Sequence, residues 1–120
     1  MNIIVLGDIM IDINHTCNIT RNAPEAQIPI YEIKDTIYVL GGAGNVVKNL
    51  NSLKTNVEII TILGNDVYGK KIQYMLNENN IKNKCFIDDK RNTTQKNRLF
   101  YNNTLVNLSL IHISEPTRPY

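Results

Sequence analysis

The chain has 120 residues, which is the usual length of one domain. Its 13 Lys and Arg against 11 Asp and Glu give a net charge of +2, too small for the basic groove of a nucleic-acid-binding protein. The 42% hydrophobic and 20% charged content fits a globular protein rather than a disordered one. No apolar run reaches the roughly 18–20 residues of a membrane span, so we expect contact with neither nucleic acid nor membrane.

An apolar run rich in β-branched residues opens the chain at residues 2–6 and stops at Gly7. Such a run predicts a buried strand, which we expect to be central in a parallel sheet. Weak alternation of apolar and polar residues follows, and residues 13–39 are predicted to form short strands of a half-exposed sheet. Pro24 and Pro29 punctuate this segment and are typical of an edge strand.

The glycine-rich residues 41–44 break this pattern, and the apolar residues that follow recur at helical spacing. The predicted apolar face of this helix consists of Val46, Val47, Leu50 and Leu53. Residues 57–63 predict a second buried strand, and Asp66 is placed to cap the next helix. The predicted buried face of that second helix consists of Tyr68, Ile72, Met75 and Leu76.

Residues 84–87 predict a short third strand, and residues 93–106 predict a strand or a hairpin that turns at Asn102 and Asn103. Alternating strands and helices are typical of βαβ units on a parallel sheet, which makes this an α/β protein. The segments 13–39 and 93–106 do not fit that layer. We expect them to form a small second sheet that projects from the first.

We expect no secretion signal at the amino terminus, because residues 1–8 lack a basic region and carry only a short apolar run. Cys17 and Cys85 lie far apart without CxxC spacing, which indicates two reduced thiols in a cytoplasmic protein. His15 is the one histidine before the carboxyl-terminal tail, so we expect no metal site. A catalytic role for Cys17 beside His15 is not expected.

Residues 108–120 (LSLIHISEPTRPY) resemble a translated sequencing adapter rather than a natural continuation of the chain. We expect the native sequence to stop near Asn107 and the tail, including His112, to have no functional meaning. The chain would then be a truncated fragment with a domain over residues 1–107. A genuine disordered tail is the alternative.

The first candidate binding element is the glycine turn at residues 41–45 (GGAGN), directly before a predicted helix. Glycines allow the backbone to approach a ligand closely, and a helix amino terminus presents free N–H groups to oxygens or anions. The turn lacks the third glycine of the dinucleotide fingerprint at Val47 and the Gly-Lys pair of the Walker motif before Lys48. A helix start without a ligand remains the alternative.

Two further elements carry charged side chains. Asp12 follows the first strand, where ligands of parallel α/β sheets bind, and a carboxylate there accepts hydrogen bonds from substrate hydroxyls. In an extended strand Thr94, Lys96 and Arg98 point to one face, where the two cations suit a phosphate or several hydroxyls. The alternatives are a solvated loop aspartate and an edge strand protected by charges.

Three motifs taken together resemble the PfkB, or ribokinase-like, carbohydrate kinases. They match, in order and spacing, the family's G-D-x-x-x-D opening, its glycine loop that ends in Asn, and its G-x-D-x-x-G segment. The matching segments are residues 7–12 (GDIMID), 41–46 (GGAGNV) and 64–69 (GNDVYG). Residues 23–30 and 93–98 look more narrowly like the D-glycero-D-manno-heptose 7-phosphate kinase branch. The resemblance covers about residues 2–107.

The resemblance implies a Rossmann-like ribokinase fold, here an incomplete parallel sheet with helices, plus a small β-sheet lid over about residues 13–39 and 93–106. It implies that Asp12 binds sugar hydroxyls and that the glycine turn with Asn45 lines the sugar site. Charge and position assign Lys96 and Arg98 to the phosphate of the sugar. The expected substrate-binding residues are Asp12, Gly41, Gly42, Asn45, Lys96 and Arg98.

The heptose branch phosphorylates the anomeric hydroxyl of its substrate on the way to ADP-heptose and lipopolysaccharide. The resemblance implies ATP and Mg²⁺ as cofactors. The family's catalytic base is an Asp in a G-A-G-D motif of the carboxyl-terminal half, and this chain has no such motif. We therefore expect no catalytic residue, few of the ATP and Mg²⁺ contacts, and no kinase activity in the chain as it stands.

Two other functions stay open at this stage. The chain fits another PfkB sugar or nucleoside kinase, and it also fits a non-catalytic small α/β binding module complete at this length. A homodimer through the lid is one arrangement open to the full-length protein. We also expect the main sheet to expose an apolar face and unpaired edges, because the family's missing half supplies further strands and helices.

Overall fold

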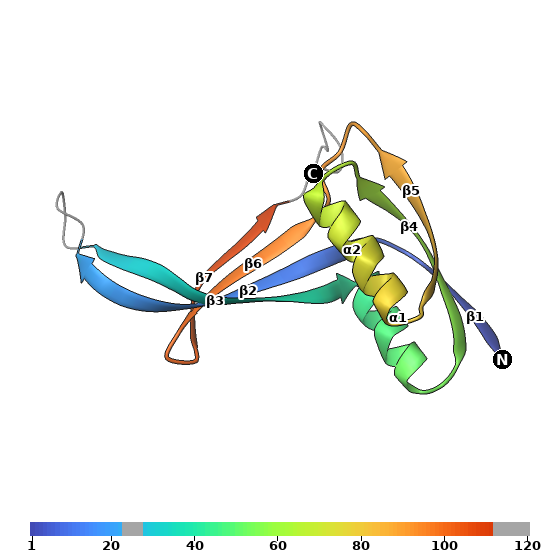
Figure 1. Cartoon of the computed structure of the whole chain (residues 1–120), viewed down its shortest axis with the longest axis horizontal. Coiled ribbons are helices and arrows are strands. Elements are labelled where there is room, and N and C mark those ends of the chain that lie inside the picture. The colour runs from blue at the N-terminus through green and yellow to red at the C-terminus, as the bar shows by residue number, and fades with distance from the viewer. Residues whose placement is uncertain (23–27, 112–120) are drawn as a thin grey trace, which may run out of the picture.

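The computed structural model describes residues 1–22 and 28–111. Three features of the sequence analysis lie wholly or partly outside these described residues: Pro24, the segment 23–30 and His112. The molecule is elongated, with extents of 57 × 36 × 26 Å, and consists of two sheets joined end to end (Figure 1).

A three-stranded parallel sheet in the order β1-β4-β5 forms one end of the molecule (Figure 1). Both helices pack on the same face of this sheet, and the predicted α/β class is confirmed. The elements are β1 (Asn2–Leu6), α1 (Ala43–Ser52), β4 (Asn56–Gly64), α2 (Val67–Glu78) and β5 (Lys82–Asp88).

The position of β1 differs from the prediction, because β1 lies at the edge of this sheet and β4 at its centre. β1 pairs with β4 in parallel, and its side chains alternate between the two faces. Ile3 and Val5 pack against the core, whereas Ile4 and Leu6 are 63% and 79% exposed. The apolar run reflects a second apolar face that no described element covers, rather than burial on both sides.

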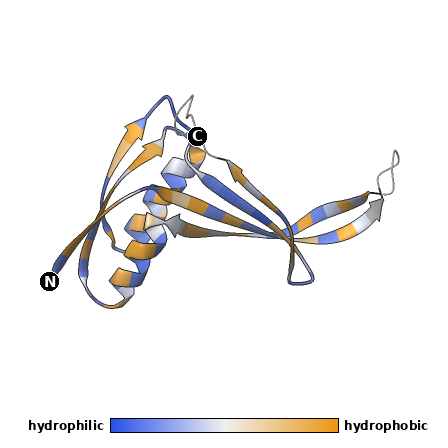
Figure 2. Ribbon diagram, turned by 180° about the vertical axis from the view of Figure 1, so that it is seen from behind, coloured by the Kyte–Doolittle hydropathy of each residue, from blue (hydrophilic) through white to orange (hydrophobic). Residues whose placement is uncertain are grey.

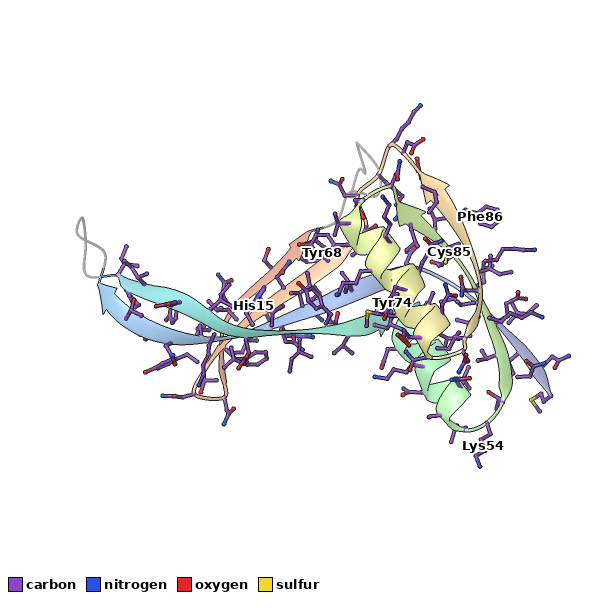
Figure 3. All side chains as sticks on the ribbon, in the orientation of Figure 1. His15, Lys54, Tyr68, Tyr74, Cys85 and Phe86 are labelled. Atoms are coloured by element: carbon purple, nitrogen blue, oxygen red, sulfur yellow. The ribbon has the colours of Figure 1, made fainter. Side chains whose placement is uncertain are left out.

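That uncovered face continues across the sheet, as expected from the sequence. Leu6, Ile60, Ile62 and Phe86 line a hollow of about 360 Å³ near the carboxyl ends of the three strands. Figure 3 shows Phe86 pointing away from the helices, and Figure 2 shows the run of apolar residues along β4 and β5. Exposed apolar area of this kind is typical of a surface that another protein segment covers.

The second sheet has four strands in the order β3-β2-β6-β7 and forms the predicted lid. β2 pairs with β3 in antiparallel and with β6 in parallel orientation, and β6 and β7 form a hairpin. The predicted hairpin turn is confirmed at Asn102 and Asn103, both of which have positive φ. The strands are β2 (Ile9–Asn22), β3 (Pro29–Gly42), β6 (Gln95–Tyr101) and β7 (Thr104–Ile111).

The lid strands are longer than the sequence predicted. β2 and β3 are two continuous 14-residue strands rather than several short ones, because two bulges absorb the breaks in alternation. β3 starts at Pro29 and lies at the sheet edge, which confirms the edge-strand interpretation. β7 runs through residues 108–111, the start of the tail that the sequence sets apart.

One hydrophobic core joins the two sheets at their shared base. Ile11 and Leu40 of the lid pack in the same cluster as Val47 of α1 and Ile59 of β4, and all four are fully buried. The predicted face of α2 is confirmed, with its central isoleucine and leucine at the heart of the cluster. On α1 the prediction is partly wrong, since Val46 and Leu53 are exposed.

Candidate functional site

The end of β1 and the glycine turn meet in the structure. Gly42 caps α1 with φ of 58°, and a β-carbon on it would lie 2.7 Å from the backbone oxygen of Asp8. The N–H of Ala43 donates to that same oxygen at 2.8 Å. A side chain at position 42 would therefore be strained by both backbone conformation and space, which explains the glycine.

Gly41 makes room for the carboxylate of Asp12. Gly41 pairs with Met10 on the neighbouring strand, and a β-carbon on it would lie 2.6 Å from Oδ1 of Asp12. Oδ1 is buried and accepts no hydrogen bond from the described residues. An unpaired buried acceptor costs roughly 1–3 kcal/mol, so this oxygen is suited to a hydroxyl donor from a ligand.

The two predicted cations lie on the same face as Asp12. In the parallel pairing of β2 and β6, Asp12 is opposite Lys96 and Asn14 is opposite Arg98. Nη1 of Arg98 lies 3.5 Å from Oδ2 of Asp12 and 3.5 Å from Oδ1 of Asn14. Both contacts are long for charge-assisted hydrogen bonds, so the guanidinium is held loosely.

Asn14 is a member of this cluster that the sequence analysis missed. The available signal was its spacing of two from Asp12, which places both side chains on one face of a strand. Asn45, by contrast, was predicted for the site and lies exposed in the first turn of α1. Among the described residues, its side chain has no hydrogen-bond partner.

A second cluster lies where β4, α2 and the start of β6 meet. Asp66 caps α2 as predicted, accepting the N–H of Gly69 at 2.7 Å. Its carboxylate also accepts the Thr93 hydroxyl at 2.7 Å and the Thr93 N–H at 2.8 Å. The same hydroxyl accepts the N–H of Gly64 at 3.0 Å, so every polar group of the cluster is paired.

These bonds determine the ionisation of Asp66. Partial burial alone would raise its pKa, but hydrogen bonds from Thr93 and from the N–H of Gly69 outweigh burial. The net effect holds the pKa of Asp66 below its usual value, so the carboxylate is charged at neutral pH.

His15 and Cys17 of the lid have structural partners. Nδ1 of His15 is hydrogen-bonded to the Thr36 hydroxyl at 2.9 Å. The buried thiol of Cys17 donates to the Phe100 carbonyl at 3.2 Å, which fits a packing role. Within the described ranges no group of three His, Cys, Asp or Glu side chains is arranged to hold a metal ion. No helix among residues 1–22 and 28–111 is long and apolar enough to cross a membrane.

Comparison with known proteins identifies the family. The profile of the pfkB family carbohydrate kinases matches residues 1–118, nearly the whole chain. The chain belongs to the PfkB carbohydrate kinase family. The sequence-based resemblance and the ribokinase-like fold with its lid are thereby confirmed.

Among curated PfkB relatives, the bifunctional protein HldE of Campylobacter concisus is 41% identical over 100 residues, covering 82% of this chain and 21% of that protein. HldE of Helicobacter pylori is 37% identical over 102 residues, covering 84% and 22%. The chain thus spans about a fifth of the length of these relatives.

Among solved structures, a carbohydrate kinase from Agrobacterium tumefaciens matches 92% of this chain and 35% of its own, with TM-score 0.74 and 26% identity. A putative phosphofructokinase from Staphylococcus aureus matches 99% and 36%, with TM-score 0.71 and 20% identity, which shows a shared fold.

Proposed function

We propose that this chain is the sugar-binding half of an ATP-dependent carbohydrate kinase. The observation that carries the proposal is the meeting of Asp12, Gly41 and Arg98 on one face, from three strands far apart in sequence. A buried acceptor beside a loosely held guanidinium suits a ligand with both hydroxyls and an anionic group.

The ligand that fits this face is a phosphorylated sugar. A sugar hydroxyl donates to Oδ1 of Asp12, the buried acceptor for which residues 1–22 and 28–111 supply no donor. The guanidinium of Arg98 and the ammonium of Lys96 bind the phosphate, Arg98 exchanging its long contact with Asp12 for a shorter charge-assisted one. Gly41, Gly42 and Asn45 line the hydroxyl end of the sugar.

Within this class we propose D-glycero-D-manno-heptose 7-phosphate, phosphorylated on its anomeric hydroxyl toward ADP-heptose and lipopolysaccharide. The support is the similarity to several HldE proteins, together with two cations on β6 for the 7-phosphate. Another sugar kinase of the same family is the rival. If Lys96 and Arg98 do not contact the ligand, an unphosphorylated sugar is the ligand that fits the site.

The reaction of the whole enzyme would transfer the γ-phosphoryl group of ATP, with Mg²⁺, to the sugar hydroxyl. Such transfer depends on positioning and charge stabilisation, and this chain contributes the sugar side only. We propose that the isolated chain has no kinase activity, that the enzyme works in the cytoplasm without nucleic acid or membrane, and that its lid is available for a homodimer.

Calorimetric or NMR titration of the chain with the heptose 7-phosphate, the unphosphorylated heptose and fructose 6-phosphate tests this proposal. Arg98→Gln should weaken the sugar phosphate at least about tenfold, the worth of one charge-assisted hydrogen bond, and leave the unphosphorylated sugar unchanged. Asp12→Asn should weaken both sugars. Lys54→Gln, an equal charge change at the far end of α1 (Figure 3), is the matched control. Equal affinities in wild type and Arg98→Gln would show that the face does not bind phosphate.

A further inference from the structure

The segment of residues 64–69 supports the family assignment, and the cap that Asp66 provides for α2 gives it only a local role. Its side chains do not reach Asp12 or Arg98. Instead, Asp66 accepts two hydrogen bonds from Thr93, a residue 2% exposed and 27 positions away, and the Thr93 hydroxyl accepts a third from the N–H of Gly64. Thr93 lies two residues before the first residue of β6, the strand that carries both cations.

These three hydrogen bonds among Asp66, Thr93 and Gly64, called the clamp below, allow Thr93 little freedom to move. A β-carbon on Gly64 would lie 2.5 Å from the Arg91 carbonyl and 2.6 Å from the Thr93 nitrogen. A β-carbon on Gly69 would clash with the Gly64 carbonyl and lie 3.0 Å from the Thr93 hydroxyl. Both glycines are therefore required for Thr93 to sit this close to the β4–α2 turn.

The clamp is followed directly by the first contact between β6 and β2. The carbonyl of Thr94 accepts the N–H of Ile11 at 3.0 Å, and the next pair is Ile11 with Gln95. Asp12 then falls opposite Lys96. In a strand a slip of one residue turns every side chain to the other face, which here would move both cations to the helix-covered side.

We propose that Asp66 and Thr93 are positioning residues that fix the register of β6, so that Lys96 and Arg98 face Asp12. The inference rests on the proposed sugar-phosphate site. It means that the G-x-D-x-x-G segment determines specificity for phosphorylated sugars indirectly, by setting the position of the two cations. Its effect is selective: loss of the clamp removes the phosphate contacts and spares the hydroxyl contacts at Asp12.

Thr93→Val removes the hydroxyl while keeping the shape of the side chain, and Thr93→Ser keeps the hydroxyl. In the 120-residue chain the ratio of affinities for the heptose 7-phosphate and the unphosphorylated heptose should fall about tenfold in Thr93→Val, as for loss of a contact to a charged group. Thr93→Ser should keep the ratio. Thr61→Val is the matched control, since Thr61 is equally buried and donates to the Gly7 carbonyl at 2.8 Å.

Hydrogen exchange of the Ile11 amide is a second measurement that needs no ligand. It should be faster in Thr93→Val than in Thr61→Val at matched global stability, because the amide is the first to pair with the β6 segment. An unchanged affinity ratio in Thr93→Val, with wild-type binding intact, overturns the inference. If the wild-type chain binds neither sugar, the proposed function fails instead, and equal Ile11 exchange in the two variants then also overturns the register role.

Discussion

Asp12 lies within β2 and Asp66 caps α2, and the surroundings of the two carboxylates are opposite. Asp66 accepts three hydrogen bonds of 2.7–2.8 Å from Gly69 and Thr93. Asp12 has one oxygen that receives no hydrogen bond from the described part of the chain and another that lies 3.5 Å from Nη1 of Arg98. A satisfied carboxylate adds stability to the fold, whereas an unsatisfied one costs stability that a ligand recovers.

This contrast separates a structural cluster from a binding face within one small chain. The cluster at Asp66 joins the main sheet to the lid, and the face at Asp12 depends on that joint for its cations. Substitutions at the two clusters should therefore differ in kind. At the Asp66 cluster stability falls together with phosphate affinity, whereas at the Asp12 face the loss is chiefly one of sugar affinity.

The largest expected effect is that of Asp66→Ala on stability. The substitution leaves the N–H groups of Gly69 and Thr93 without their acceptor and removes the cap of α2, which should lower the free energy of unfolding by about 2–4 kcal/mol. Urea unfolding measures the loss. Asp89→Ala, which removes an exposed bond from Asn65, is the control and should cost under about 0.5 kcal/mol. Equal losses in the two variants would contradict a special role for Asp66.

A pair of glycine substitutions gives the next effect. Gly64→Ala places a methyl group against backbone atoms and should lower the free energy of unfolding by about 1–3 kcal/mol. Gly41→Ala places it against side-chain atoms of Asp12 and Met10, which can move, so stability should fall less while sugar affinity falls. Urea unfolding and sugar titration of both variants separate the two costs. A Gly41→Ala chain with wild-type affinity would show that Asp12 is not confined by Gly41.

The features that depend on residues close together in the sequence could be predicted from the sequence alone. The cap at Asp66, the glycine turn and the apolar periodicity of α2 depend on neighbours along the chain. The edge position of β1 and the cluster at Asn14 were not predictable, since both depend on strand order and register. Strand order and register are set by pairings between distant residues, such as Asn14 with Arg98, which are 84 residues apart. A pattern of neighbouring residues does not predict such pairings.

Acid pH should weaken the Asp66 cluster. Burial acts to raise the pKa of Asp66, but the hydrogen bonds from Thr93 and Gly69 lower it below the ordinary value. The stability contributed by this ionised carboxylate is complete above the unfolded-state pKa of about 3.9 and is lost as pH falls through the lower folded-state pKa. Thermal unfolding from pH 7 to pH 2 should show wild type approaching Asp66→Asn in acid. A gap between them that stays constant with pH would mean that ionisation of Asp66 adds nothing.

The smallest expected effect is that of removing residues 108–120. The backbone of residues 108–111 extends β7 beside β6, but Leu108 and Leu110 are 52% and 60% exposed and add little to the core. The deletion should change the free energy of unfolding by less than about 1 kcal/mol and leave the affinity for sugar phosphate unchanged, because β2 already holds Arg98 on its other side. Removal of residues 104–120 is the control, since it deletes the whole partner strand. Should the shorter deletion weaken phosphate binding as much as Arg98→Gln does, the tail would be a working part of the lid.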